Sequence, residues 1–130
     1  MRAGRVLEGQ SAANSASPLA GTGRQLRRAI DPAVAAVFEV EVSDLRAATR
    51  RSPRAAFARQ VAMYLAHVVC GLSLTEVGTL FARDRTTVAH ACGVVEDRRD
   101  DPVLDSRLDH LERAICSLLD ALTWHRHGHQ

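Results

Sequence analysis

Two closely spaced helix boundaries in the middle of the chain constrain the fold more than any other feature of the sequence. Gly71 can adopt the left-handed conformation that ends a helix. Ser73, with Glu76 three residues later, forms a capping box that starts the next helix. Asp84 is a favourable N-cap for a further helix. The pattern predicts two short helices joined by a tight turn at residues 82–84, a helix-turn-helix motif.

Apolar residues recur at spacings of three and four, which is the period of a helix with one buried face. No strand-like alternation is sustained anywhere in the sequence. Apolar residues make up 46% of the chain and aromatic residues 4%, so the core must be aliphatic and rich in alanine. We therefore expect an all-α fold with one compact helical domain. The positions expected to face its core are Val34, Val37, Phe38, Phe57, Val61, Leu65, Val68, Val69, Leu74, Val77, Phe81, Val88, Cys92 and Val95.

Both ends of the chain are predicted to be flexible. Residues 1–28 are rich in Ala, Gly and Ser and carry too little apolar surface to offset the entropy of ordering them. Asp31 before Pro32 predicts the start of the first helix, because an acidic N-cap before a proline is a favoured beginning. The expected organisation is a tail at 1–28, a domain at 29–123 and a His-containing tail at 124–130.

The last predicted helix opens at Asp101-Pro102 and carries a long apolar stripe. Its members are Leu104, Leu108, Leu111, Ile115, Leu118 and Leu122. Six positions match one contact face of a globular domain, and the flanking charges are not ordered as in a coiled coil. The stripe is interpreted as core, with a dimer seam as the alternative.

Charge is distributed unevenly, although the formal net charge is only +2. Residues 46–85 contain seven Arg against two acids, whereas residues 96–120 contain eight acids against four Arg. A short turn of helix at Ser43-Asp44-Leu45, followed by Pro53, predicts a basic loop between them. All 17 basic residues are Arg, so a phosphate-binding loop or a Schiff base that needs a lysine is excluded. The middle of the chain is predicted to form a basic face, with the acidic last helix pointing away from it.

The helix expected after Asp84 has an outward face of short or polar side chains. They are Arg85, Thr86, Ala89, His90 and Gly93. Thr86 and Thr87 are poor helix formers, which is unusual in an exposed helix unless their hydroxyl groups are used. Such a face can lie close to another surface and reach phosphates and base edges. We interpret it as a binding surface and predict no catalytic residues.

The remaining reactive side chains do not form a site. Cys70, Cys92 and Cys116 are odd in number and far apart, which favours reduced thiols, two of them at apolar helix positions. The terminal residues 124–130 carry alternating His but no zinc-binding pattern. We predict no metal, no cofactor and no enzymatic activity. The absence of a signal peptide and of a long apolar run predicts a cytoplasmic protein.

Three segments together carry a resemblance to a known family. They are Arg59-Gln60-x-Ala62-Met63-Tyr64-Leu65, Ser73-Leu74-x-Glu76-Val77-Gly78-x-x-Phe81 and Arg83-Asp84-Arg85-Thr86-Thr87-Val88-x-His90-Ala91. From about Ile30 to Leu122 the chain resembles the C-terminal domain IV of the bacterial replication initiator DnaA. The resemblance implies a Trp-repressor-like helix-turn-helix.

The resemblance also implies roles for individual residues. Thr86 and Thr87, with Val88 and Ala89 alongside, would enter the major groove of duplex DNA, and Arg51 in the basic loop would enter the minor groove. Arg59, Gln60 and Arg83 match residues that contact the DNA backbone or the edge of the site. His90, one turn after Thr86, would meet a phosphate. Arg85 replaces a family His, and because its guanidinium favours guanine O6 and N7, the target preference is expected to differ.

Two functions remain open from the sequence. The first is sequence-specific binding of double-stranded DNA at initiator-box-like sites by a stand-alone, nucleoid-associated protein. This protein would bind neither nucleotide nor membrane and would have no ATPase activity. It would act as a monomer on DNA and regulate replication initiation or transcription, with the replication initiation machinery as a further partner. The alternative is a protein interaction module that keeps the fold and binds through the stripe from Leu104 to Leu122.

Overall fold

The computed structural model describes the backbone of residues 19–47 and 52–127, and the side chains of 23–47 and 52–121. Every regular element in these ranges is a helix, which confirms the all-α fold class. The elements are α2 (Leu19–Phe38), α3 (Val42–Arg46), α4 (Pro53–Val68), α5 (Leu74–Phe81), α6 (Arg85–Arg98) and α7 (Pro102–His127). None of these helices is both long enough and apolar enough to span a membrane.

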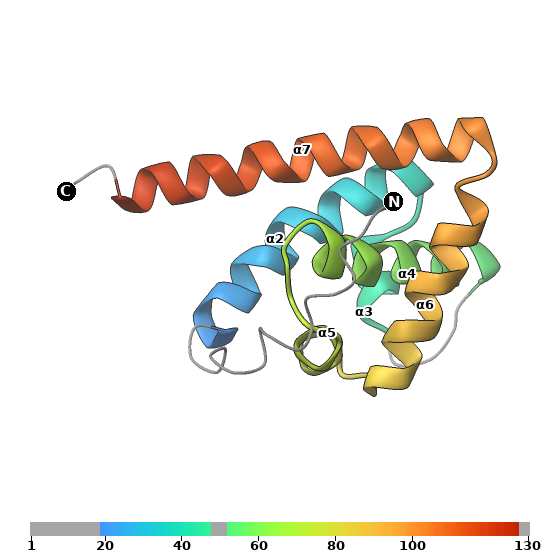
Figure 1. Cartoon of the computed structure of the whole chain (residues 1–130), viewed down its shortest axis with the longest axis horizontal. Coiled ribbons are helices and arrows are strands. Elements are labelled where there is room, and N and C mark those ends of the chain that lie inside the picture. Colours follow the sequence, from blue (N-terminus) through green and yellow to red (C-terminus); the bar gives the residue numbers. More distant parts are fainter. Residues whose placement is uncertain (1–18, 48–51, 128–130) are drawn as a thin grey trace.

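Helix α4 lies at the centre of the domain. It contacts α2, α3, α5 and α6, and residues 61–66 are buried on all sides. The two longest helices, α2 and α7, cross one side of it, while α5 and α6 lie on the other (Figure 1). The core is aliphatic apart from Tyr64, Phe38 and Phe81, as the composition predicted. The helix-turn-helix is thus held on a scaffold made by α2, α4 and α7.

Helix α2 begins earlier than predicted. It starts at Leu19, and Pro32 lies inside it, so Asp31 is not an N-cap and residues 19–28 are not part of a tail. Leu26 and Ile30 are buried in the core, and their burial outweighs the hydrogen bond that the proline removes. Residues 1–18 of the predicted tail lie outside the described residues.

The apolar stripe of α7 is core along its first half. Leu108, Leu111 and Ile115 are buried, whereas Leu118 is 45% exposed. The side chain of Leu122 lies outside the described residues. Helix α7 continues to His127, four residues past the predicted end of the domain at residue 123.

Local signals set most of the remaining boundaries. Pro53 opens α4, and the Ser52 hydroxyl caps the helix by accepting a hydrogen bond from the backbone N–H of Ala55 (3.1 Å). Gly71 has a φ of 76°, as expected for the residue that ends the α4 region. His67 is half-buried, and its Nδ1 lies 2.7 Å from the carbonyl oxygen of Leu72. This contact ties the end of α4 to the segment that leads into α5.

The three cysteines are free thiols in different surroundings. Cys70 and Cys92 are partly buried against the core, as predicted, and Cys116 is exposed. Burial raises the pKa of both Cys70 and Cys92 to about 12. These two thiols are therefore protonated at neutral pH and behave as small apolar side chains.

Candidate nucleic-acid interface

Helix α5 is capped at its start and closes into a tight turn at its end. At its start the predicted capping box is present: the backbone N–H of Ser73 donates to Glu76 Oε1 (2.8 Å), and the Glu76 N–H donates to Ser73 Oγ (3.0 Å). At its end the N–H of Arg83 donates to the carbonyl of Gly78 (2.9 Å). A β-carbon on Gly78 would lie 2.5 Å from the Arg83 carbonyl oxygen. The glycine is therefore what allows the turn to close onto α5.

Ala82 adopts the left-handed conformation at the C-cap of α5, with φ 57° and ψ 47°. An alanine in this region costs roughly 1–2 kcal/mol relative to the right-handed helix, and glycine avoids this cost. We expect Ala82→Gly to raise the free energy of unfolding by about 1 kcal/mol. Urea titration checks this value. The same substitution at exposed Ala114 of α7 should destabilise, and a loss of stability in both variants would contradict the prediction.

Helix α6 packs one face into the domain and leaves the other free. Val88, Ala91 and Val95 are buried against α4 and α5. The residues predicted to face outward are exposed, and so is Thr87; the predicted set is Arg85, Thr86, Ala89, His90 and Gly93. No described residue forms a hydrogen bond or ion pair with Arg85. The amino end of α6 therefore projects from the body with a free guanidinium and two hydroxyl groups.

Asp84 occupies the N-cap position, as predicted, but its side chain does not cap the helix in the described part of the chain. Instead its Oδ1 accepts a long hydrogen bond of 3.5 Å from Thr87 Oγ1. Thr86 makes no such contact with a described residue. The two threonines thus differ, since the hydroxyl of Thr87 has an internal partner and that of Thr86 faces solvent.

The other predicted contact residues lie in three different environments. Arg83 is partly exposed beside the turn, where its Nη1 donates to the carbonyl of Ala82 (3.4 Å). Gln60 is partly buried on α4. Arg59 is only 7% exposed, and its Nη2 donates to the carbonyl of Asp44 in α3 (2.9 Å). Its position favours support of α3 over direct contact with a ligand. Arg51 lies outside the described residues.

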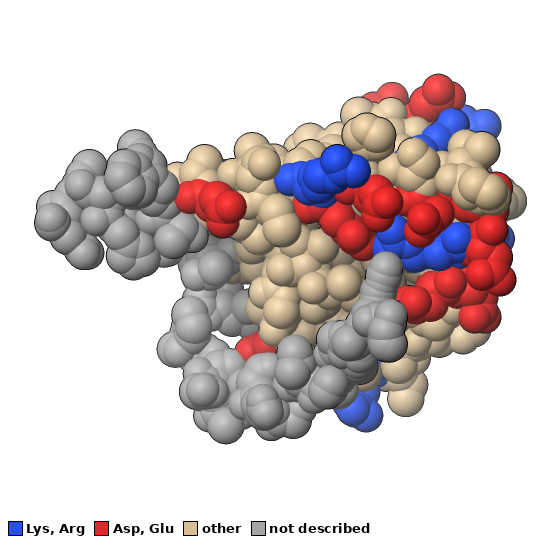
Figure 2. Space-filling view, turned by 45° about the horizontal axis from the view of Figure 1, so that its top comes forward, with Lys and Arg blue, Asp and Glu red and all other residues tan. Residues whose placement is uncertain are grey.

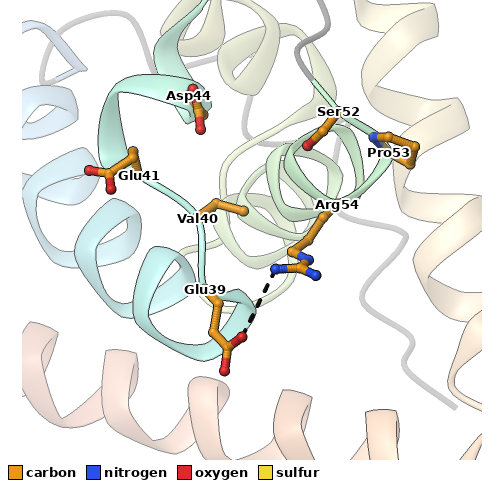
Figure 3. A pocket seen from close by; sticks show the side chains of 7 residues that line it. All are labelled: Glu39, Val40, Glu41, Asp44, Ser52, Pro53 and Arg54. Atoms are coloured by element: carbon orange, nitrogen blue, oxygen red, sulfur yellow. Dashed lines mark ion pairs between the residues drawn. The ribbon is translucent and has the colours of Figure 1, made fainter.

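The basic face is smaller than the sequence predicted. Arg59 is buried, and Arg46 pairs with Asp31. Arg54 is exposed at the start of α4 and lies 4.0 Å from Glu39. Figure 3 shows this pair at the edge of a hollow that is lined by Glu39, Val40, Glu41, Asp44, Ser52, Pro53 and Arg54. Arg54 is thus partly neutralised by Glu39, the residue that directly follows α2.

Acidic side chains gather on the opposite part of the molecule. Figure 2 shows them in a band over α7 and the junction between α6 and α7, with Arg side chains between them. The first turn of α6 carries no acidic residue, whereas its last turns carry Glu96 and Asp97. This polarity along α6 agrees with the predicted separation of charge.

Comparison with known proteins adds to this geometry. The family model described as "Bacterial dnaA protein helix-turn-helix" matches residues 28–95, which run from α2 through most of α6. The chain belongs to this family. The predicted resemblance to the DnaA C-terminal domain is confirmed.

Individual relatives of the family agree. Chromosomal replication initiator protein DnaA 1 of Protochlamydia amoebophila is 42% identical over 85 residues, which is 65% of this chain and 19% of that protein. DnaA of Treponema denticola is 31% identical over 116 residues, which is 85% of this chain and 24% of that protein. The chain thus spans about a fifth to a quarter of these relatives.

Two solved structures share the fold. A crystal structure of a DNA replication initiation factor superposes with a TM-score of 0.60 at 32% identity, covering 76% of this chain and 32% of that one. The replication initiator DnaA bound to AMPPCP and single-stranded DNA gives a TM-score of 0.59 at 29% identity, covering 82% and 34%.

Proposed function

We propose that this chain binds double-stranded DNA by placing the amino half of α6 in the major groove. The observation that carries the proposal is the free outward face of α6, with Arg85 and Thr86 unengaged by any described residue. Family membership supports it, because the matched relatives are chromosomal replication initiators. The proposal needs no nucleotide, metal or catalytic group, and it places the protein in the cytoplasm with the nucleoid.

The shape and chemistry of α6 suit this role. The major groove of B-form DNA admits an α-helix, and the helix amino terminus attracts phosphate. Ala89 and Gly93 have little or no side chain and allow a close approach to the base edges. Arg85 offers a planar pair of donors to guanine O6 and N7, and Thr86 a hydroxyl to a base or phosphate.

Residues around α6 complete the proposed interface. Arg83 and His90 are proposed to contact phosphates, and Gln60 the edge of the site. Thr87 would contact DNA after exchanging its bond with Asp84. Arg59 contributes by holding α3, and Arg51 is proposed as the minor-groove contact on the resemblance to the family alone. The expected targets are initiator-box-like sites that control replication initiation or transcription.

Fluorescence polarisation with an initiator-box duplex and a scrambled duplex tests the proposal. If about five phosphates are neutralised, the logarithm of the association constant should fall with the logarithm of salt concentration with a slope of about −4.5. The box duplex should bind more tightly at each salt concentration. Equal affinity for both duplexes throughout the titration would refute sequence-specific binding.

We expect Arg85→Ala to reduce base discrimination by about 1–3 kcal/mol at one or two positions of the site. The loss arises because alanine cannot form the bidentate contact with guanine. Selection of bound duplexes from a randomised pool measures it, and Arg107→Ala on exposed α7 is the matched control. Equal weakening of all sequences would show that Arg85 contacts phosphate only.

The structure weakens the alternative of a protein interaction module. That function needs an apolar surface on α7, but Leu108, Leu111 and Ile115 are used in the core. Of the described stripe residues, Leu118 is the one that is mainly exposed, and single exposed apolar residues are normal on a protein surface. A stable dimer in light scattering, together with no DNA affinity, would restore the alternative.

A further inference from the structure

Asp31 is a fully buried carboxylate that binds arginines from two helices. Its two oxygens accept hydrogen bonds from Nε of Arg27, one turn earlier in α2 (3.2 and 3.0 Å), and Oδ2 also pairs with Arg27 Nη2 (2.9 Å). Oδ2 accepts a further bond from Nε of Arg46 (3.3 Å). Arg46 is the last residue of α3. One buried charge therefore joins α2 to the end of α3.

The same network reaches the helix-turn-helix through Arg27. Its Nη1 donates to the carbonyl of Leu80 (3.3 Å), one of the last carbonyls of α5. Its guanidinium carbon lies 4.0 Å from the centre of the Phe81 ring. Leu80 and Phe81 immediately precede Ala82, the left-handed residue of the turn into α6. Arg27 thus fixes the point at which α5 passes into the turn.

We propose that Asp31, acting through Arg27 and Arg46, is a positioning residue that sets where α3 lies relative to α5 and the turn into α6. The inference rests on the proposed function, because the expected consequence of this positioning is discrimination between DNA sequences. A protein that contacts DNA from α6 and from the chain that follows α3, where Arg51 is the proposed minor-groove contact, must hold α3 and α6 at one spacing. A small displacement of either helix weakens the contacts made from the other.

A buried ion network suits positioning better than it suits stability. Replacing a buried ion pair with apolar side chains of similar volume is often neutral or stabilising. Charge-assisted hydrogen bonds from the Nε atoms of Arg27 and Arg46 to one carboxylate, in contrast, fix orientation as well as distance. Two apolar side chains in place of Arg27 and Asp31 could not donate a hydrogen bond to the carbonyl of Leu80. The network therefore fixes the orientation of α3 and α5 relative to α2, which the packing of apolar side chains alone does not do.

The double variant Arg27→Met/Asp31→Leu separates the two roles. It removes the charges without leaving an unpaired buried ion, so the urea midpoint should stay near that of the wild type. Discrimination between the box and scrambled duplexes should nevertheless fall by roughly fivefold or more, the usual scale of coupling between two sites. Amide hydrogen exchange should quicken at the end of α3 and at residues 79–83.

Ile115→Val is the matched control, since it removes one buried methyl group from α7 and alters no charge or hydrogen bond of the network. It should change the urea midpoint without lowering discrimination. The inference is overturned if the double variant keeps both the discrimination and the exchange rates of the wild type, or if the control loses discrimination equally. Failure of the wild type to bind DNA would instead refute the proposed function. In that case, faster hydrogen exchange at both α3 and the turn in the double variant would still show that Asp31 couples these two segments.

Discussion

Replacing Arg99 with methionine is expected to lower the free energy of unfolding by about 3 kcal/mol. Arg99 is the C-cap of α6, and its side chain is 7% exposed. Loss of the guanidinium would leave a group of acidic side chains facing one another without a counter-charge. This loss is at the low end of the range for breaking a buried ion pair, because the acidic side chains are partly exposed to water.

The contacts of Arg99 explain the size of the effect. Its guanidinium pairs with Asp105 (2.6 Å), Asp109 (2.8 Å) and Glu112 (2.6 Å), which lie on one face of α7. Its Nη1 also donates to the hydroxyl of Tyr64 in α4 (2.9 Å). Burial alone would lower the pKa of the Arg99 guanidinium, but hydrogen bonds with Asp105, Glu112 and Tyr64 outweigh it and raise the pKa. One cation therefore joins α4, α6 and α7.

Urea unfolding followed by circular dichroism measures the loss. Arg107→Met, on the exposed side of α7, is the control and should stay within about 0.5 kcal/mol of the wild type. In the Arg99→Met background, Glu112→Gln should restore part of the stability because it removes repulsion between acids, whereas alone it should destabilise. A loss below about 1 kcal/mol for Arg99→Met would put the network in the class of surface ion pairs.

The helix-turn-helix could be predicted from the sequence because its signals are local. Ser73 and Glu76 cap the same turn of helix, and Gly71 needs no partner to adopt a positive φ. The outward face of α6 followed from the period of the helix once Val88 and Val95 were assigned to the core. These features depend on residues within a few positions of one another.

The features that the sequence did not reveal depend on distant residues. In the sequence, Asp31 before Pro32 resembles the start of a helix. In the structure Asp31 lies within α2 as a buried charge that pairs with Arg27 and Arg46. Arg59 had the appearance of a surface base until packing placed it against the carbonyl of Asp44. The acids of α7 read as a solvated face, yet three of them surround Arg99. Charge counts along a sequence cannot distinguish free charges from paired ones.

Gly78→Ala is expected to destabilise the protein by about 1–3 kcal/mol, the range for forcing extra atoms into a packed site. The new β-carbon would lie 2.5 Å from the Arg83 carbonyl oxygen, a backbone atom that cannot rotate away. The turn must therefore open, which breaks the bond from the Arg83 N–H to the Gly78 carbonyl and shifts the start of α6. The gain in helix propensity, at most about 1 kcal/mol, offsets only part of this cost.

Gly93→Ala is the matched control, because it is the same substitution in the neighbouring helix with no atom within 4 Å of the new β-carbon. It should stabilise α6 by about 0.5–1 kcal/mol, so the two variants should move the urea midpoint in opposite directions. Equal stabilisation by both would show that the turn has room to relax. DNA affinity is compared between Gly78→Ala and the wild type alone, because Gly93 lies on the proposed DNA-binding face. A displaced α6 in Gly78→Ala should weaken binding to box and scrambled duplexes and reduce the difference between them.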